Sequence, residues 1–576
     1  MGLRICLVTP FAWSQPHDVN EHVAGVAAGL RDFGHTVTVR APSSRAVDLI
    51  AGRRALLDGG THDVIALGPA LPISRQSRMG VPVGVRANLA LALAQGAFDV
   101  VHGFEPGLPS LSYLALRDAQ ALTVASFFSI ERLGYPPGRA QRLRLLGRTD
   151  ALIAASAEVA AAAAERFPGD YTVLSSGVDT DLFRPRAKRR LAVLESRPGE
   201  RPLARALIRI LLELPGWELV LLRDRPGARP YVPRALRERV HVRTARDAAT
   251  RASLLGGAAV FVPSPTGAAT LELEAQAAGA VLAAPSGVRE QPELAAAAFA
   301  RLAEDARLRE RRAAEGRSHA ESAGYAIVAG ELDRLYRRLA GRRRVGPTEA
   351  DPLADRDWIV ADLHLHTSWS HDCAVPAAEL LDQAEEEGLG AIAITDHNVF
   401  GGALEAVELA RGRDLIVIAG EEVKTKGQGE VIGLFLSEEI PKGLSFVDTV
   451  GAIRAQGGLV YLPHPFDRRH AIPDPATLHR HLADIDVFEV YNARLLREPY
   501  NDEALRFARK YNLTMGAGSD AHVLQGLGTG ALRMRRFEGP DEFLLSLRTA
   551  EILRRPKSLL YLQSLKWAAQ AKERVR

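Results

Sequence analysis

Five short apolar runs in the second half of the chain each lead into residues that bind metal ions, and this repetition constrains the fold most. The ends of these runs read Asp362-Leu363-His364-Leu365-His366-Thr367, Asp396-His397, Gly420-Glu421-Glu422, Pro463-His464-Pro465 and Ser519-Asp520-Ala521-His522. In a parallel β/α barrel, functional side chains lie at the carboxyl ends of the strands, so ligands from separate strands converge there. The pattern therefore predicts a barrel with a metal site at one end.

The first run carries two histidines, His364 and His366, separated by one residue. Side chains alternate between the two sides of an extended strand, so both imidazoles lie on one side and can reach one metal ion. In a chain with 16 histidines such a pair also arises by chance. The other four run-ends are what favour a metal site.

The series HLHT, TDHN, GEE, PHP and GSDAH resembles the polymerase-and-histidinol-phosphatase (PHP) domain over about residues 358–550. The resemblance implies a distorted seven-stranded β/α barrel that holds two or three metal ions and hydrolyses phosphoesters. It implies nine metal ligands: His364, His366, Asp372, His397, Glu422, Glu430, His464, Asp520 and His522. Glu430 fills a place that is often His in relatives.

Histidines and carboxylates without thiolates suit Mn, Zn or Fe. Nine ligands are too many for one ion, and we expect Glu422 to bridge two of them. We assign Glu422, Asp520 and Arg494 to catalysis. Asn492 and Arg494 follow a predicted strand and are candidates for binding the substrate phosphate, although a surface pair at the barrel rim is an equal alternative. The substrate is a phosphorylated small molecule or the end of a nucleic acid.

The first half of the chain alternates predicted strands and helices twice over, which is typical of doubly wound parallel sheets. We expect two Rossmann-like domains, residues 1–186 and 187–340, followed by a charged linker with Gly and Pro at 341–357 and the barrel at 358–576. The overall prediction is an α/β protein of three domains.

The segments GHTVTV, FDVVHGFEPGLPSL, SSGVDTDLFRP and LELEAQAAGAVLAAP resemble retaining glycosyltransferases of the two-sheet GT-B class, family 4, over residues 1–340. The resemblance implies a sugar-nucleotide site in a cleft, with Glu274 as a donor contact. This chain departs from the family at four places: Pro16-His17-Asp18-Val19 where a Gly-Gly turn is usual, Phe128 where His is usual, Thr266 where Glu is usual, and the altered basic pattern at 194–201. We therefore expect weak sugar-nucleotide or glycan-phosphate binding without transfer. The alternative is an active glycosyltransferase with an accessory PHP domain.

Other sequence features bear on the partners and the location of the protein. The net charge of +4 over 576 residues leaves a nucleic-acid partner undecided. Cys6 and Cys373 fall in different predicted domains, which indicates free thiols and a cytoplasmic location. The sequence has no apolar run of the ~20 residues that a membrane-spanning helix needs. The tail from Tyr561 to Arg576, which includes Lys566, predicts an amphipathic terminal helix, with contact to a membrane or to RNA as a further alternative.

Overall fold

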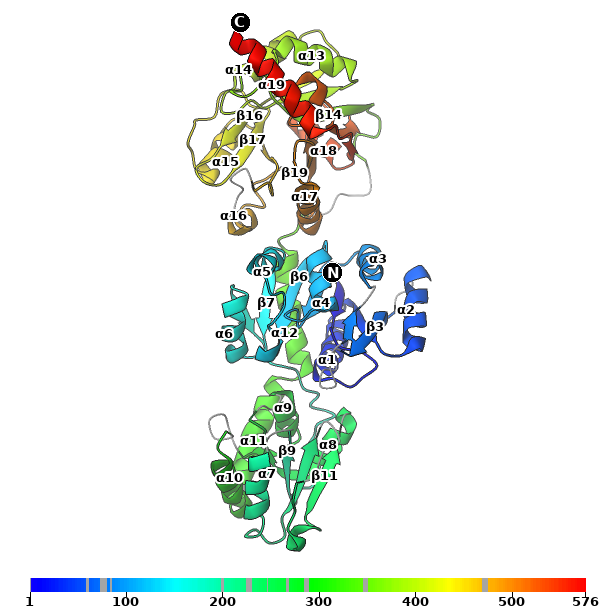
Figure 1. The fold of residues 1–576 in the computed structure, drawn as a ribbon, viewed down its shortest axis with the longest axis vertical. Helices are drawn as coiled ribbons and strands as arrows, with labels where there is room; N and C mark the ends of the chain where they lie inside the picture. The colour runs from blue at the N-terminus through cyan, green and yellow to red at the C-terminus, as the bar shows by residue number, and fades with distance from the viewer. Residues whose placement is uncertain are drawn as a thin grey trace. The chain divides into compact units, whose positions relative to one another are not determined.

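The computed structural model divides the chain into two compact units, 1–340 and 341–576, called here the amino-terminal and carboxyl-terminal units (Figure 1). The described residues are 2–58, 62–72, 80–82, 85–197, 201–223, 230–245, 247–265, 269–283, 290–344, 351–468 and 475–575. Thr266, one of the four departures named above, lies outside them.

The amino-terminal unit begins with an eight-stranded sheet of order β4-β3-β2-β1-β5-β6-β7-β8. Its strands are β1 (Arg4–Val8), β2 (Thr36–Ser43), β3 (Val64–Pro72), β4 (Gly80–Pro82), β5 (Val100–Phe104), β6 (Leu122–Phe127), β7 (Ala151–Ala154) and β8 (Tyr171–Val173). Its helices are α1 (Asp18–Asp32), α2 (Ala46–Asp58), α3 (Arg86–Gly96), α4 (Leu111–Asp118), α5 (Arg139–Leu146) and α6 (Ala157–Arg166). Seven strands run parallel, and β4 pairs antiparallel with β3 at the edge.

A second sheet in this unit has five parallel strands in the order β11-β10-β9-β12-β13. Its strands are β9 (Arg189–Glu195), β10 (Glu218–Arg223), β11 (Val240–Thr244), β12 (Ala258–Val262) and β13 (Val281–Leu282). The accompanying helices are α7 (Arg201–Ile210), α8 (Ala248–Gly257), α9 (Ala269–Ala277), α10 (Pro292–Glu304) and α11 (Ala306–Ser322). The prediction of two tandem parallel sheets is therefore confirmed.

Helix α12 (Tyr325–Ala340) follows the second sheet but packs against α1 of the first. A Cβ on Gly29 of α1 would lie 2.7 Å from the Ala329 Cβ, so the close approach of the two helices needs a glycine. The Tyr336 hydroxyl lies 2.6 Å from His102 Nδ1 in the first sheet. The chain thus returns to its first sheet at the end of the amino-terminal unit.

The carboxyl-terminal unit holds a nine-stranded mixed sheet of order β20-β19-β18-β17-β16-β15-β14-β21-β22. The strands are β14 (Trp358–Leu365), β15 (Ala391–Ile394), β16 (Ile416–Lys424), β17 (Glu430–Leu434), β18 (Leu459–Leu462), β19 (Val487–Asn492), β20 (Met515–Gly518), β21 (Gly530–Arg535) and β22 (Glu551–Arg554). The helices are α13 (Ala377–Glu386), α14 (Gly401–Leu409), α15 (Phe446–Ala455), α16 (Pro475–Arg480), α17 (Glu498–Tyr511), α18 (Gly539–Leu547) and α19 (Leu559–Val575).

This sheet differs from the expected seven-stranded barrel, because it has nine strands and is nearly closed rather than clearly a barrel. The first half of β14 pairs antiparallel with β21, whereas its second half bonds to the segment after β20. There the Asp520 N–H donates to the His364 carbonyl at 2.8 Å, and the His366 N–H donates to the Ala521 carbonyl at 3.2 Å. β14 therefore contacts both β21 and the segment after β20, and β21 and β22 continue the sheet beyond β14.

Candidate metal centre

The metal-binding residue types gather where the strands of the carboxyl-terminal unit end. His364 and His366 lie at the end of β14 and are fully buried, with ring centroids 5.2 Å apart. Ala361 and Leu363 of the same strand face the apolar core instead. The period-2 alternation expected from the sequence therefore places both histidines on the site side.

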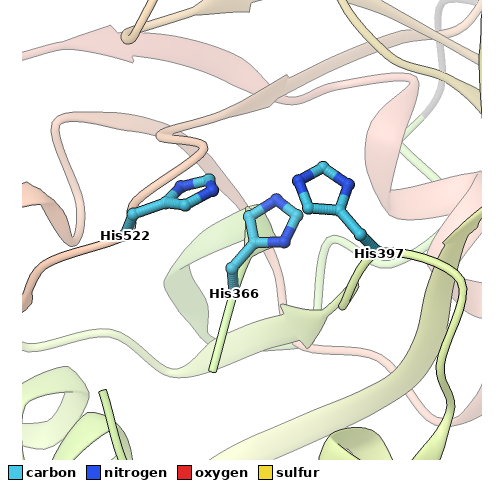
Figure 2. Close-up of side chains that lie close together, drawn as sticks. All are labelled: His366, His397 and His522. Carbon is cyan, nitrogen blue, oxygen red and sulfur yellow. The ribbon is translucent and has the colours of Figure 1, made fainter. Parts of the chain in front are cut away.

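Eight of the nine predicted ligands form four overlapping groups in which the potential ligand atoms lie within 4.8 Å of one another. The groups are His366, His397 and His522; His364, His366 and Asp520; His364, Glu422 and His464; and His397, Glu422 and Glu430. Figure 2 shows the first group, with the rings of His397 and His522 on either side of His366. Each outer ring centroid is 4.4 Å from that of His366.

Glu430 reaches the site because its strand is antiparallel. β17 begins at Glu430, which pairs with Lys424 at the carboxyl end of β16. The start of an antiparallel strand lies at the same edge as the ends of its parallel neighbours. Glu430 Oε2 is 3.7 Å from His464 Nε2, which places it beside a histidine from another strand.

Glu422 lies at the centre of the cluster and is buried. Its Oε2 is 3.5 Å from His364 Nε2 and 3.6 Å from His366 Nε2. The same oxygen is 2.9 Å from His397 Nδ1, and Oε1 is 3.0 Å from His464 Nε2. One carboxylate thus faces four imidazoles from three other strand ends, which is the arrangement a bridging ligand needs.

This crowding shifts the pKa values of the metal-free site. Burial alone would lower the pKa of His397 and of His464, but the Glu422 carboxylate outweighs burial and raises each to about 9. Burial would raise the pKa of Glu422, yet His364 and His397 hold it well below its usual range. Without metal, Glu422 is therefore a carboxylate that favours the protonated forms of His397 and His464.

Hydrogen bonds fix the orientation of the two β14 histidines. His364 Nδ1 lies 3.1 Å from Glu489 Oε1, so it donates to that carboxylate. The Ser370 hydroxyl donates to Asp396 at 2.6 Å and therefore accepts from His366 Nδ1 at 3.2 Å. In both rings the proton is on Nδ1, which leaves Nε2 as the ligand atom.

Glu489 and Ser370 were not predicted as functional residues. Glu489 also accepts from the Tyr461 hydroxyl at 2.9 Å and from the His464 N–H at 2.6 Å. Its sequence signal is a carboxylate inside the apolar run of β19, because a buried charge in a strand needs partners. Ser370 has no comparable signal, since its role depends on the position of Asp396 on another segment.

The residues fit divalent metal ions. His364 Nε2 and His366 Nε2 are buried and make no hydrogen bond within the described residues, although each points towards Glu422. A buried imidazole nitrogen without a partner is costly unless another group uses its lone pair. Histidine and carboxylate donors without thiolates are the ligands of catalytic Zn, Mn or Fe sites.

Comparison with known proteins identifies the family of the carboxyl-terminal unit. A model of the PHP domain matches residues 362–486, and a PHP-associated model matches 498–552. An uncharacterized protein of Methanocaldococcus jannaschii is 35% identical over 212 residues, which are 34% of this chain and 84% of that protein. The carboxyl-terminal unit belongs to the PHP family. A solved amidohydrolase from Chromobacterium violaceum is 19% identical and covers 34% of this chain and 98% of its own, with a TM-score of 0.27.

The amino-terminal unit matches a different family. The Glycosyltransferase Family 4 model covers residues 19–182. A phosphatidyl-myo-inositol mannosyltransferase of Mycobacterium tuberculosis is 28% identical over 388 residues, 59% of this chain and 98% of that protein. The chain therefore joins a region similar to family 4 glycosyltransferases, called here the family 4 region, to a PHP domain. Among the described residues, no helix is long and apolar enough to cross a membrane.

A cavity of about 700 Å³ opens onto the candidate metal site of the PHP domain. Among its lining residues are the predicted ligands His397, Glu430, Asp520 and His522. Arg494, Lys424 and Lys566 add three cations to the wall. This combination suits an anionic substrate.

Asp372, the ninth predicted ligand of the PHP domain, lies at the cavity rim rather than inside the four groups. Its Oδ2 is 3.0 Å from His522 Nε2, and its Oδ1 is 3.7 Å from His397 Nε2. Lys566 Nζ donates to the same Oδ2 at 2.7 Å. Asp372 thus borders the group of His366, His397 and His522.

The two predicted phosphate-binding residues take different positions. Asn492 is buried, and its side-chain amide donates to Glu489 at 3.1 Å and to Asp520 at 3.3 Å. Arg494 lines the cavity, and its Nη1 donates to Asp520 Oδ1 at 3.0 Å. Asn492 is therefore placed to position two carboxylates, whereas Arg494 is placed to meet a substrate.

The predicted donor contact of the family 4 region is already engaged by the protein itself. Arg251 Nε donates to Glu274 Oε2 at 2.7 Å, and Nη2 donates to Glu274 Oε1 at 2.6 Å. The same Nη2 donates to Glu21 Oε2 of α1 at 2.6 Å. Arg251 thus binds Glu274 through Nε and Nη2, and Nη2 also binds Glu21.

The turn before α1 is also closed by a side chain. His17 caps the helix, and its Nδ1 accepts from the Val19 N–H at 3.2 Å. In a glycine-rich turn this amide would be open to a phosphate. Phe128, which stands where a histidine was expected, packs at 4.9 Å between ring centroids against His22.

Proposed function

We propose that the PHP domain is a metal-dependent phosphoesterase, which cleaves a P–O ester bond with water to give an alcohol and a phosphate. The observation that carries this proposal is the convergence of His364, His366, His397 and His464 on the Glu422 carboxylate. Family membership and the cationic cavity wall support it independently.

Two or three divalent ions, Mn, Zn or Fe, would be held by the nine predicted ligands. Such ions, when bound, activate water and neutralise the charge that develops on phosphorus oxygens. Glu422 and the four histidines around it would hold metal ions, and Asp520, whose Oδ1 accepts from Arg494, would be a further ligand. Arg494 binds a phosphate oxygen through the nitrogen that Asp520 does not use. Asn492 and Glu489 keep Asp520 and His364 in place.

Phosphate release tests the proposal. The purified full chain with added Mn should release phosphate or alcohol from an aryl phosphate or a nucleotide, and a chelator should abolish the reaction. The variant His366→Ala should lose activity by at least about 100-fold, since a ligand of two groups is removed. If a broad phosphoester panel gives no turnover with bound metal verified, the PHP domain is a metal-stabilised binding module instead.

The substrate is a phosphorylated small molecule or a nucleic-acid end. The salt dependence of substrate binding distinguishes these two substrate classes. Each phosphate contact with a polynucleotide releases counterions, so its binding should weaken steeply with salt. A KM that changes little between low and physiological salt would favour the small molecule.

We infer that the family 4 region carries no glycosyl transfer. Three observations support this: the Arg251 ion pairs on Glu274, the His17 cap on Val19, and Phe128 at the expected histidine position. Sugar-nucleotide hydrolysis or transfer by the full chain would overturn the inference and favour the alternative of an active transferase with an accessory PHP domain. We further propose the domain limits 1–186, 187–340 and 358–576, with 341–357 as a linker.

A further inference from the structure

The terminal helix α19 contributes a lysine to the wall of the PHP cavity. The family models match up to residue 552, so this helix lies outside both of them. Leu560, Leu562, Gln563 and Lys566 of α19 line the cavity. The sequence predicted an amphipathic helix here, but gave no reason to place Lys566 beside the metal ligands.

Lys566 and Arg494 converge on one carboxylate oxygen. Lys566 Nζ lies 2.7 Å from Asp372 Oδ2, and Arg494 Nη2 lies 3.9 Å from the same atom. His522 Nε2 is 3.0 Å from it. The Lys566 side chain is only 11% exposed, so its ammonium group has lost most of its water. Asp372 Oδ2 therefore marks a position where two cations and an imidazole surround one anionic oxygen.

We propose that Lys566 is a substrate-binding residue that, together with Arg494, holds the terminal phosphate of a phosphomonoester. This proposal rests on the phosphoesterase function and narrows its substrate class. A metal ion at Asp372 would take up much of that carboxylate's charge. The buried ammonium of Lys566 then needs another anion nearby, because an uncompensated buried charge is strongly unfavourable. A phosphate in the cavity supplies one.

The charge of the site favours a monoester over a diester. A monoester phosphate carries close to two negative charges near neutral pH, as phosphorylated side chains do, whereas a diester carries one. The attraction between ions grows with the product of their charges. Two protein cations in addition to the metal ions therefore discriminate by charge. Lysine suits this role as a compact point charge that needs no fixed fork geometry.

The competing explanation is that Lys566 only positions Asp372 for a metal ion. Under that explanation, removing the lysine changes metal content and leaves the affinity for phosphate at the remaining metal unchanged. Under the proposal, metal content is kept and phosphate affinity falls. Equilibrium binding of inorganic phosphate separates the two without relying on turnover.

The experiment uses the full chain loaded with Mn and compares Lys566→Met, Lys566→Gln and Lys566→Arg. Lys557→Met is the matched control, because Lys557 precedes the same helix and donates to the Gln525 carbonyl at 2.8 Å outside the cavity lining. Each protein is measured by elemental analysis, by calorimetry with inorganic phosphate, and by kcat/KM for an aryl phosphate monoester and a bis-aryl diester.

We expect Lys566→Met and Lys566→Gln to keep wild-type metal content and bind phosphate at least tenfold more weakly. Their kcat/KM should fall more for the monoester than for the diester, and Lys566→Arg should recover part of the phosphate affinity. Unchanged phosphate affinity in both neutral variants, or a loss of metal in both, would overturn the proposal. Should the methionine variant fail to fold, the glutamine variant decides. A wild-type chain that hydrolyses no phosphoester would remove the phosphoesterase function, whereas the phosphate-binding result would stand by itself.

Discussion

At the residue scale, the candidate site depends on groups that are not among its predicted ligands. His364 and His366 present Nε2 because Glu489 and Ser370 take their Nδ1 protons. Seven of the nine predicted ligands were predictable from the sequence pattern, since they follow the five apolar runs, whereas Asp372 and Glu430 were predicted only from the resemblance to the PHP domain. Glu489, Ser370 and Lys566 were not, because their roles depend on contacts between segments far apart in the chain.

Glu489 gives the first prediction at this scale. The variant Glu489→Gln weakens the acceptor for His364 Nδ1 and for the His464 N–H, so we expect metal affinity to fall about 10- to 100-fold. Competition with a chelator of known affinity measures the change. The control is Glu498→Gln, whose side chain is 56% exposed. Equal metal affinity in the two variants would show that Glu489 does not orient the ligand.

The second prediction concerns pH. In the metal-free chain, His397 and His464 have pKa values raised to about 9, so their ion pairs stabilise the fold fully below the ordinary histidine value of 6.5. That stabilisation is lost as the pH rises through about 9. Thermal unfolding of the chelated protein should therefore show Tm falling between pH 6.5 and 9.

The matched variants for this test are His397→Gln and the exposed His319→Gln in α11. The first should flatten the fall in Tm, and the second should leave it as in the wild type. A wild-type Tm that rises across this pH range would contradict the assignment of both histidines as protonated in the metal-free site.

At the scale of elements, β14 carries two of the histidines at its end and contacts both β21 and the segment after β20. The five apolar runs correspond to β14, β15, β16, β18 and β20, because burial on both faces needs continuous apolar sequence. They did not predict the direction of β17 or the β21–β22 extension, since a run of apolar residues carries no information on its pairing partner. For this reason the sequence predicted a seven-stranded barrel and not the nine-stranded sheet of the structure. The antiparallel start of β17 is also what brings Glu430 to the metal site.

Closure of the sheet at β20 gives the third prediction. A Cβ on Gly518 would lie 2.3 Å from the His364 Cβ, so Gly518→Ala should push the two strands apart. We expect a loss of about 1–3 kcal/mol in the free energy of unfolding, as for other overpacked sites, and weaker metal binding. Gly451→Ala in α15 is the control, because nothing lies within 4 Å of its added Cβ. It should be neutral or slightly stabilising in urea unfolding.

At the scale of the whole molecule, the chain forms two compact units, and all nine predicted metal ligands lie in the second. In the family 4 region, Glu274 is paired with Arg251. In the PHP domain, His364 Nε2 and His366 Nε2 point towards Glu422 and make no hydrogen bond within the described residues. The tandem parallel sheets could be predicted because strand and helix patterns alternate throughout residues 1–340. The occupation of Glu274 could not, since Arg251 and Glu21 lie on different helices and meet only in the folded unit.

Removing Arg251 gives the fourth prediction. The variant Arg251→Gln leaves the buried Glu274 and its neighbour Glu21 without their cation, so we expect the amino-terminal unit to lose about 3 kcal/mol of stability. Arg209→Gln, which removes an exposed pair with Glu293, is the control and should change little. Thermal unfolding measures both. Metal content should stay at the wild-type value, because every predicted ligand lies in the PHP domain.

Metal content of the purified chain tests the central claim most directly. Elemental analysis should find two or three equivalents of a transition metal in the wild type. Glu422→Gln, which changes the carboxylate that faces four histidines, should lose at least one equivalent, whereas the exposed Glu405→Gln should lose none. A wild-type chain that contains no transition metal and takes up none from Mn, Zn or Fe solutions would contradict the metal centre and the phosphoesterase built on it.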